Sequence, residues 1–94
     1  MPAPLHLKAR LAELPGDPGV YLYKDKKDTI IYVGKASILK RRVRSYFTKQ
    51  HSDTKTNVLV SHIQSIDWIV PSSEVEALFL EAELIKRYKP IYNV

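Results

Sequence analysis

Two short segments that each contain a tyrosine, Gly19-Val20-Tyr21 and Tyr32-Val33-Gly34, are followed at once by Lys35. Both are rich in residues that favour β-strands, and a turn between the strands would bring the two phenols together. A cation beside a phenol lowers the pKa of that phenol, so it could take a proton from water. Gly34 permits a close approach of backbone or substrate. A buried aromatic pair that only packs is the simpler interpretation, and Lys35 shifts the balance towards chemistry.

Basic residues are gathered next to these segments rather than spread along the chain. The net charge is +5, and no Asp or Glu occurs between Asp28 and Asp53. A segregated basic segment is the electrostatic footprint of a protein that binds a polyanion, although a solvated helix face explains the charge equally. The cations in this window are Lys35, Lys40, Arg41, Arg42, Arg44 and Lys49.

Residues 37–47 have helical spacing, and one arginine lies apart from the other cations. The apolar side of this helix would carry Leu39, Val43, Tyr46 and Phe47. Arg42 lies at the edge of that side, one turn before Tyr46. Its guanidinium can bind a phosphate through two hydrogen bonds, whereas the outer cations suit long-range attraction to a phosphate backbone. These outer cations are Lys40, Arg41 and Arg44.

The last predicted helix, from about Glu74 to Tyr88, carries one carboxylate out of place. Glu81 falls on neither polar edge of the helix, and its neighbours in projection include Ala77 and Ile85. A carboxylate among apolar groups is costly unless it is paired or bound to a cation. Two interpretations stay open: a salt bridge to Lys35 or Arg42, or a ligand for Mg²⁺, held by one carboxylate, waters and a substrate phosphate. The stripe expected to face the core is Val75, Leu78, Phe79, Ala82 and Ile85.

The elements that must position these residues follow from periodicity and turn residues. Strands are expected at about 20–24, 29–33 and 67–70, and helices at about 4–14, 37–47, 57–65 and 74–88. Ser73 and Glu76 form a capping-box pattern at the start of the last helix, which should end before Pro90. The expected fold is an α+β domain with a small three-stranded antiparallel sheet flanked by helices.

Composition limits the remaining possibilities. The 94 residues suit one domain, 1–94, with one modest core, and the absence of cysteine excludes disulfides and thiolate metal sites. No apolar run approaches a membrane span and no signal peptide is present, so a cytoplasmic location is expected. No glycine-rich nucleotide loop, histidine metal pair or persuasive Ser-His-acid triad occurs.

Taken in order, these residues resemble a GIY-YIG nuclease domain, most closely the type at the N-terminus of the C component of the bacterial UvrABC excinuclease. The matching segments are Gly19-Val20-Tyr21, Tyr32-Val33-Gly34-Lys35-Ala36, Arg42 with Tyr46, Glu81 and Tyr92-Asn93. The first segment has Val20 where the family name has isoleucine. Arg44-Ser45-Tyr46 and the ending from Leu84 to Val94 are typical of the excinuclease subgroup, and the resemblance covers the chain from Leu14 onward.

The resemblance implies a role for each residue at the matching positions. Glu81 would hold a single divalent ion, Mg²⁺ or Mn²⁺, and Tyr32 would be the general base, with Lys35 favouring its phenolate. Tyr21 and Arg42 would contact the scissile phosphate, and Tyr46 would help to position it. Asn93 would tie the C-terminal turn to the sheet, and both Asn93 and Gly34 would support the site structurally. Lys40, Arg41, Arg44 and Lys49 would attract DNA.

The implied function is that of a metal-dependent endonuclease in nucleotide excision repair, which cuts 3′ to a lesion in double-stranded DNA. In that family a second, RNase H-like domain makes the 5′ cut, so the chain is expected to be an N-terminal fragment of a longer protein that works with UvrB, the B component of the excinuclease. The isolated domain is expected to be a monomer without membrane contact. The alternatives are another GIY-YIG structure-specific or homing-type nuclease, a DNA-binding module without catalysis, and an α+β domain with a salt bridge at Glu81.

Overall fold

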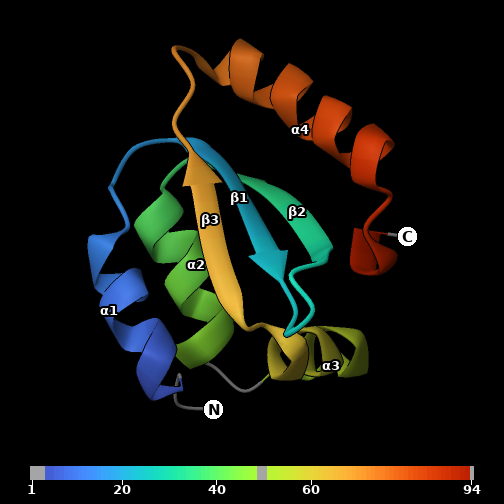
Figure 1. The fold of residues 1–94 in the computed structure, drawn as a ribbon. Helices are drawn as coiled ribbons and strands as arrows, with labels where there is room; N and C mark the ends of the chain where they lie inside the picture. The colour runs from blue at the N-terminus through green and yellow to red at the C-terminus, as the bar shows by residue number, and fades with distance from the viewer. Residues whose placement is uncertain (1–3, 49–50, 94) are drawn as a thin grey trace.

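The computed structural model describes residues 4–48 and 51–93. One antiparallel sheet is formed by β1 (Gly19–Lys24), β2 (Ile30–Ala36) and β3 (Ser65–Ile69), in the order β2-β1-β3. Around it lie α1 (Leu5–Glu13), α2 (Leu39–Thr48), α3 (Thr54–His62), α4 (Glu74–Tyr88) and the 3₁₀ helix η1 (Ile91–Asn93) (Figure 1). The predicted α+β architecture is therefore confirmed. Within the described ranges, no helix is both long and apolar enough to span a membrane.

Several element boundaries differ from those expected. Strand β2 continues through Gly34 and Lys35 to Ala36, because β1 pairs with it as far as Gly19. Helix α3 begins at Thr54 rather than near residue 57, because Asp53 caps it and accepts a hydrogen bond from the backbone N–H of Lys55. The short helix η1 was not expected.

The central strand β1 is buried on both faces, and its alternation divides the side chains between two cores. Val20 and Leu22 point to one face, where they pack with Val33 of β2 and Ala77 of α4. The tyrosines of β1 point to the other face, where α1, α2 and α3 cover them. The sheet therefore lies between α4 on one side and the other helices on the opposite side (Figure 1).

Helix α4 packs through a different stripe from the one expected. Ala77 is buried, and Leu80, Leu84 and Ile85 pack against the sheet core. The expected core residues Val75, Leu78 and Phe79 are instead 64%, 53% and 69% exposed, so the prediction was wrong for these three and correct for Ile85. The apolar residues of this helix occupy two opposite sides, and periodicity alone does not say which one meets the sheet. The observed stripe places Glu81, one turn after Ala77, on the side that faces the sheet.

The ends of α4 follow the expected chemistry. The hydroxyl of Ser73 accepts a hydrogen bond from the backbone N–H of Glu76 at 3.1 Å, while the carboxylate of Glu76 contacts the hydroxyl of Ser72. Lys89 adopts the left-handed conformation (φ 44°) that ends the helix just before Pro90. Both boundaries agree with the prediction.

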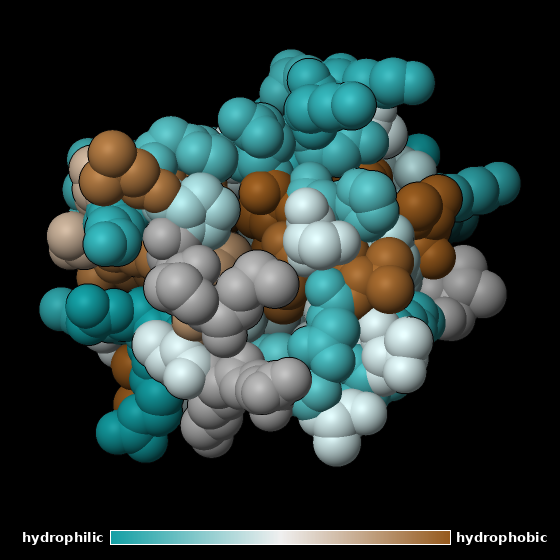
Figure 2. Space-filling model, turned by 90° about the horizontal axis from the view of Figure 1, so that it is seen from below, coloured by the Kyte–Doolittle hydropathy of each residue, from teal (hydrophilic) through white to brown (hydrophobic). Residues whose placement is uncertain are grey.

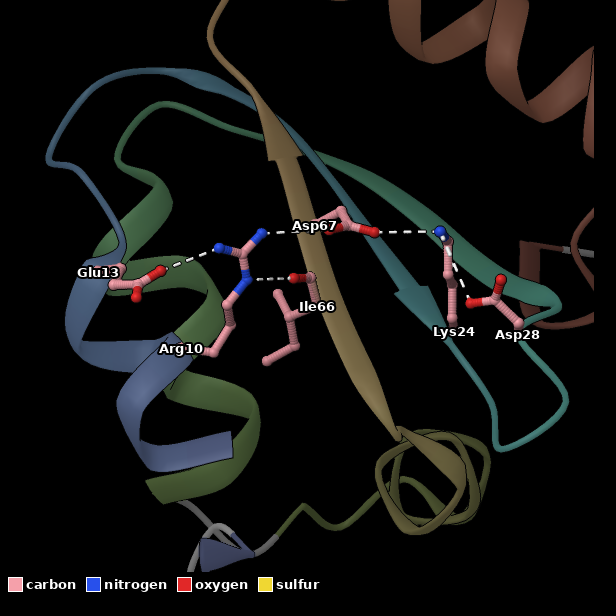
Figure 3. Close-up of polar contacts among 6 residues, drawn as sticks. All are labelled: Arg10, Glu13, Lys24, Asp28, Ile66 and Asp67. Atoms are coloured by element: carbon pink, nitrogen blue, oxygen red, sulfur yellow. Dashed lines mark hydrogen bonds and ion pairs between the residues drawn. The ribbon is translucent and has the colours of Figure 1, made fainter. Parts of the chain in front are cut away.

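Arg10 fixes α1 against the exposed edge of β3 (Figure 3). Its Nε donates to the carbonyl of Ile66 at 2.9 Å, and its other nitrogens contact Glu13 and Asp67 at 2.9 and 3.1 Å. The guanidinium also lies 4.1 Å from the ring centroid of Trp68. Because an edge strand presents unpaired backbone groups, this side chain both docks the helix and shields the edge.

Replacing Arg10 by alanine should lower the free energy of unfolding by about 1–2 kcal/mol. The loss comes mainly from the hydrogen bond to Ile66 and the contact with Trp68, because the ion pairs are largely exposed. Urea unfolding followed by fluorescence of Trp68, the single tryptophan, measures it. Lys8→Ala, at an exposed position of the same helix, is the control. Equal stability of Arg10→Ala and the control would show that Arg10 does not hold α1.

Candidate active site

The phenols of Tyr21, Tyr32 and Tyr46 are brought together on the face of the sheet covered by α2. The ring centroids of Tyr21 lie 6.1 Å from Tyr32 and 5.9 Å from Tyr46, and those of Tyr32 and Tyr46 are 6.4 Å apart. The hydroxyls of Tyr21 and Tyr46 share a hydrogen bond of 2.9 Å. Three residues from β1, β2 and α2 thus form one cluster, named here the tyrosine cluster.

A fourth tyrosine, Tyr23, lies beneath this cluster and was missed as a site residue. It is the direct cross-strand partner of Tyr32, whereas Tyr21 lies opposite Gly34. Its ring is fully buried, with centroids 5.3 Å from Tyr21 and 5.2 Å from Tyr46. Its hydroxyl has no hydrogen-bond partner among the described residues. The alternation of β1, which puts Tyr21 and Tyr23 on one face, is the signal that could have found it.

Gly34 makes room for the tyrosine cluster. A Cβ at this position would overlap the Cζ and hydroxyl of Tyr21 and approach its Cε1 to 2.9 Å. The phenol of Tyr21 therefore lies directly against the backbone of β2. The close approach expected at Gly34 is that of a side chain from the neighbouring strand.

Burial sets the protonation of the phenols. Desolvation, followed by interactions with Tyr46, raises the pKa of Tyr32 to about 12, and desolvation raises the pKa of Tyr21 further still. The positive charge of Arg42 opposes the rise at both. Lys35 follows Val33 on the α4 side of β2 and is exposed, and its predicted effect on the pKa of Tyr32 stays a prediction.

A basic hollow of about 520 Å³ lies between the end of β2 and helix α2. Lys35 and Arg42 both line it, so the structure brings these two predicted residues together. Arg41 adds a third cation, and Ser37 and Ser45 contribute hydroxyls. The hollow is lined by Lys35, Ala36, Ser37, Ile38, Arg41, Arg42 and Ser45. It could hold an anionic group of a nucleic-acid backbone.

The remaining predicted DNA contacts lie along α2. Lys40, Arg41 and Arg44 are exposed to solvent, as expected for cations that attract a phosphate backbone from a distance. Lys49 lies outside the described residues, so its predicted role has no structural counterpart here.

Glu81 lies on α4, across β2 from the tyrosine cluster. It is half-buried on the side of α4 that faces the sheet, and it makes no hydrogen bond or ion pair with any residue in the described ranges. The salt bridge to Lys35 or Arg42 considered above is absent from this part of the chain. The carboxylate oxygens of Glu81 are therefore available to a hard cation, which takes oxygen ligands.

Asn93 ties the C-terminal end of the described chain to the sheet edge. Its Oδ1 accepts a hydrogen bond from the backbone N–H of Val33 at 2.9 Å, and its Nδ2 donates to the carbonyl of Val33 at 2.8 Å. The side chain thus pairs with β2 as a neighbouring strand would. This contact lies one residue from both Tyr32 and Gly34, so it stabilises the strand segment on which the candidate site is built.

Comparison with known proteins gives matches over almost the whole chain. A sequence model of the family described as the UvrC-like GIY-YIG domain matches residues 17–94. The N-terminal GIY-YIG endonuclease domain of UvrC from Thermotoga maritima, bound to magnesium as its catalytic divalent cation, is 38% identical, with a TM-score of 0.84 over 97% of this chain and 99% of that one. A tyrosine-to-phenylalanine point mutant of that domain, also bound to its catalytic divalent cation, is 37% identical, with a TM-score of 0.85 over 97% and 98%.

The strands that carry the tyrosine cluster and the helices that carry Arg42 and Glu81 have the arrangement of a GIY-YIG domain. Within that class, this chain belongs to the UvrC-like GIY-YIG domain family. The resemblance stated from sequence is therefore confirmed. The divalent ion that it implied agrees with the magnesium bound to the Thermotoga maritima domain.

Gly34→Ala should displace the phenol of Tyr21 and reduce DNA nicking at least tenfold, with a loss of about 1–3 kcal/mol in the free energy of unfolding from overpacking. Gly16→Ala is the matched control, because a Cβ at Gly16 meets nothing within 4 Å. Denaturant unfolding and nicking rates of both variants test this. A Gly34→Ala protein as active as the Gly16 variant would show that the position of Tyr21 is not critical.

Alkaline pH should destabilise the fold through the buried phenols. Tyrosines in the unfolded chain ionise near pH 10, whereas the pKa of Tyr32 in the folded chain is raised to about 12 and that of Tyr21 is raised further. Their stabilising contribution is complete below pH 10 and is lost as pH rises above it, for Tyr32 between pH 10 and about 12. Denaturant unfolding across this range measures the loss, and Tyr32→Phe should flatten it. An identical slope in that variant would contradict the assignment.

Proposed function

We propose that this domain is a metal-dependent endonuclease that cuts one strand of double-stranded DNA on the 3′ side of a lesion during nucleotide excision repair. The observation that carries the proposal is Glu81, a half-buried carboxylate without a protein partner in the described ranges. The chain belongs to a family whose Thermotoga maritima member is an endonuclease domain bound to a catalytic divalent cation. Three phenols and an arginine lie beyond the strand that Glu81 faces.

The donor chemistry of Glu81 fits a hard divalent ion. A single carboxylate with waters and substrate phosphate is a common way for a protein to hold Mg²⁺, and no cluster of three or more acidic or histidine ligands exists in the part of the chain that the structure describes. When bound, such an ion would stabilise negative charge on the phosphate and the leaving 3′ oxygen. Glu81 is thus proposed as the one protein ligand.

Arg42 and the phenols of Tyr21 and Tyr46 are proposed to bind the scissile phosphate. The guanidinium of Arg42 acts electrostatically on both Tyr21 and Tyr32, so it lies close enough to share a substrate with them. The hydrogen bond between Tyr21 and Tyr46 holds both hydroxyl oxygens in place before substrate arrives. Donors held in place in this way stabilise developing charge without reorganising.

Tyr32 is proposed as the general base that takes a proton from the attacking water. Of the tyrosines on β1 and β2 it is the least buried, and its pKa of about 12 is the smallest rise among them. A hydrogen bond with Tyr21 and the charge of Arg42 both lower the pKa of Tyr32. Desolvation and Tyr46 outweigh these two effects, so Tyr32 keeps its proton in the domain alone, and bound substrate and metal would have to lower its pKa. The products would be a 3′-hydroxyl and a 5′-phosphate.

The rest of the repair machinery is proposed to lie outside these 94 residues. The basic side of α2 would hold DNA through its phosphates, with strong salt dependence. A longer protein would carry the second nuclease domain and the contacts with UvrB that direct the cut to damage. Its DNA substrate implies action in the bacterial cytoplasm, and the isolated domain is proposed to be a monomer.

Glu81→Gln should abolish Mg²⁺-dependent nicking of duplex DNA, because it removes the charge that holds the ion, while the fold stays intact. Glu83→Gln, two residues later on the exposed side of α4, is the matched control and should nick like the wild type. Sealing of the nicks by DNA ligase reports the 3′-hydroxyl and 5′-phosphate termini.

Binding of Mn²⁺ measured by electron paramagnetic resonance separates metal loss from other effects of the change at Glu81. The Glu81 variant should lose one bound ion and the Glu83 variant should keep it. Wild-type nicking by Glu81→Gln would refute the metal assignment. DNA binding without nicking by the wild-type domain under any divalent ion would favour a binding module without catalysis.

A further inference from the structure

A second pocket adjoins the tyrosine cluster, on the side away from the basic hollow. It has a volume of about 200 Å³ and lies between β2, α2, α3 and η1. Tyr32 and Tyr46 form one wall, Tyr92 forms another, and Asp53, Lys55 and Thr56 line the side of α3. One wall therefore belongs to two proposed catalytic residues, and whatever the pocket binds would touch the reacting group.

The positions of the two cavities along β2 and α2 place them at opposite ends of the tyrosine cluster. The basic hollow is lined by Lys35 and Arg42, and the second pocket by Tyr32 and Tyr46. Tyr32 and Lys35 are three residues apart on a strand, or roughly 10 Å, and Arg42 and Tyr46 are one helical turn apart. A DNA strand whose phosphate lies over the cluster would extend into both cavities.

The two cavities differ in charge, which separates what each can bind. The basic hollow has three cations and suits phosphate. The second pocket has one cation, Lys55, and one anion, Asp53, whose carboxylate accepts hydrogen bonds from the backbone N–H of Lys55 at 3.1 Å and from the hydroxyl of Thr56 at 2.8 Å. Those two hydrogen bonds, with that to Thr56 the larger cause, lower the pKa of Asp53, so it stays charged and opposes a phosphate.

The rest of the second pocket's lining is aromatic and aliphatic. Its lining includes three tyrosines and Leu59. The ring of Tyr92 also makes a stacked contact with His62, with ring centroids 6.4 Å apart and an interplanar angle of 25°. Base–aromatic stacking is the sequence-tolerant way in which proteins bind single-stranded nucleic acid. Figure 2 views the molecule from the α3 side and shows hydrophobic patches among hydrophilic side chains.

We infer that this pocket binds the sugar and base of the nucleotide next to the scissile phosphate, with the base stacked against Tyr92. The inference rests on the proposed nuclease function and adds a subsite to it. The volume is on the scale of one nucleoside and too small for a base pair, so the pocket receives one strand. Stacking without hydrogen-bond readout would accept any base, as a repair enzyme that meets lesions in any sequence requires.

Thymidine 3′,5′-bisphosphate, one nucleoside between two phosphates, tests the inference without metal or lesion. In ¹⁵N-labelled protein it should shift the backbone amides of residues 53–59 and 92 as well as those around the basic hollow. The same bisphosphate with an abasic sugar should shift only the amides around the basic hollow. Intermolecular NOEs from the thymine methyl group to the ring of Tyr92 in the wild type give a readout that needs no variant.

Tyr92→Leu should weaken thymidine bisphosphate binding about tenfold or more, as loss of one base–aromatic contact does. It should leave binding of the abasic bisphosphate unchanged, and Tyr92→Phe, which keeps the ring, should bind like the wild type. Equal weakening of both ligands by Tyr92→Leu, or absence of shifts and NOEs at Tyr92, would overturn the inference. If the domain nicks DNA but binds the bisphosphate only in the basic hollow, the proposed nuclease function stands and the inference of this subsite is overturned.

Discussion

The contact between the ring of Tyr21 and the backbone of Gly34 is the constraint on which the candidate site depends. Strand β1 is buried on both faces, so its odd-numbered side chains at 21 and 23 must enter the core beneath α2. A phenol has room there only because its cross-strand partner has no Cβ. The hydroxyl of Tyr21 then forms a hydrogen bond with that of Tyr46. This contact helps to hold α2, which also carries Arg42, against the tyrosine cluster. A side chain at position 34 would disturb all of these contacts at once.

This packing has a cost that a purely structural core would avoid. Tyr23 keeps a hydroxyl without a hydrogen-bond partner in the described ranges, which typically costs about 1–3 kcal/mol. Phenylalanine would fill the same volume at position 23 without that penalty. The hydroxyls of Tyr21 and Tyr32 lie where the charge of Arg42 offsets part of the effect of desolvation on their pKa values, which fits the chemical role proposed for them.

Sequence patterns predicted the sheet, the basic helix, both ends of α4 and the tie through Asn93, because each depends on local periodicity, on a cap or on a family motif. They failed where an element has two apolar sides. Helix α4 could present Val75, Leu78 and Phe79 or Ala77, Leu80 and Leu84 to the sheet, and only packing against Val20 and Val33 decides between them. Closeness in sequence has a related limit: Lys35 is three residues from Tyr32, but its side chain lies on the α4 side of β2. The pocket at Tyr92 unites four elements and has no sequence signal.

The sheet separates the two kinds of chemistry that phosphodiester hydrolysis needs. Phenols and an arginine occupy one face, and an acidic residue occupies the other, with β2 between them. If Glu81 lay among the phenols, its charge would raise their pKa values further and would pair with Arg42, removing that cation from the phosphate. Placing the carboxylate on α4, across a strand held at its outer edge by Asn93, keeps it free of the arginine. A substrate at the edge of β2 can then draw on both faces at once.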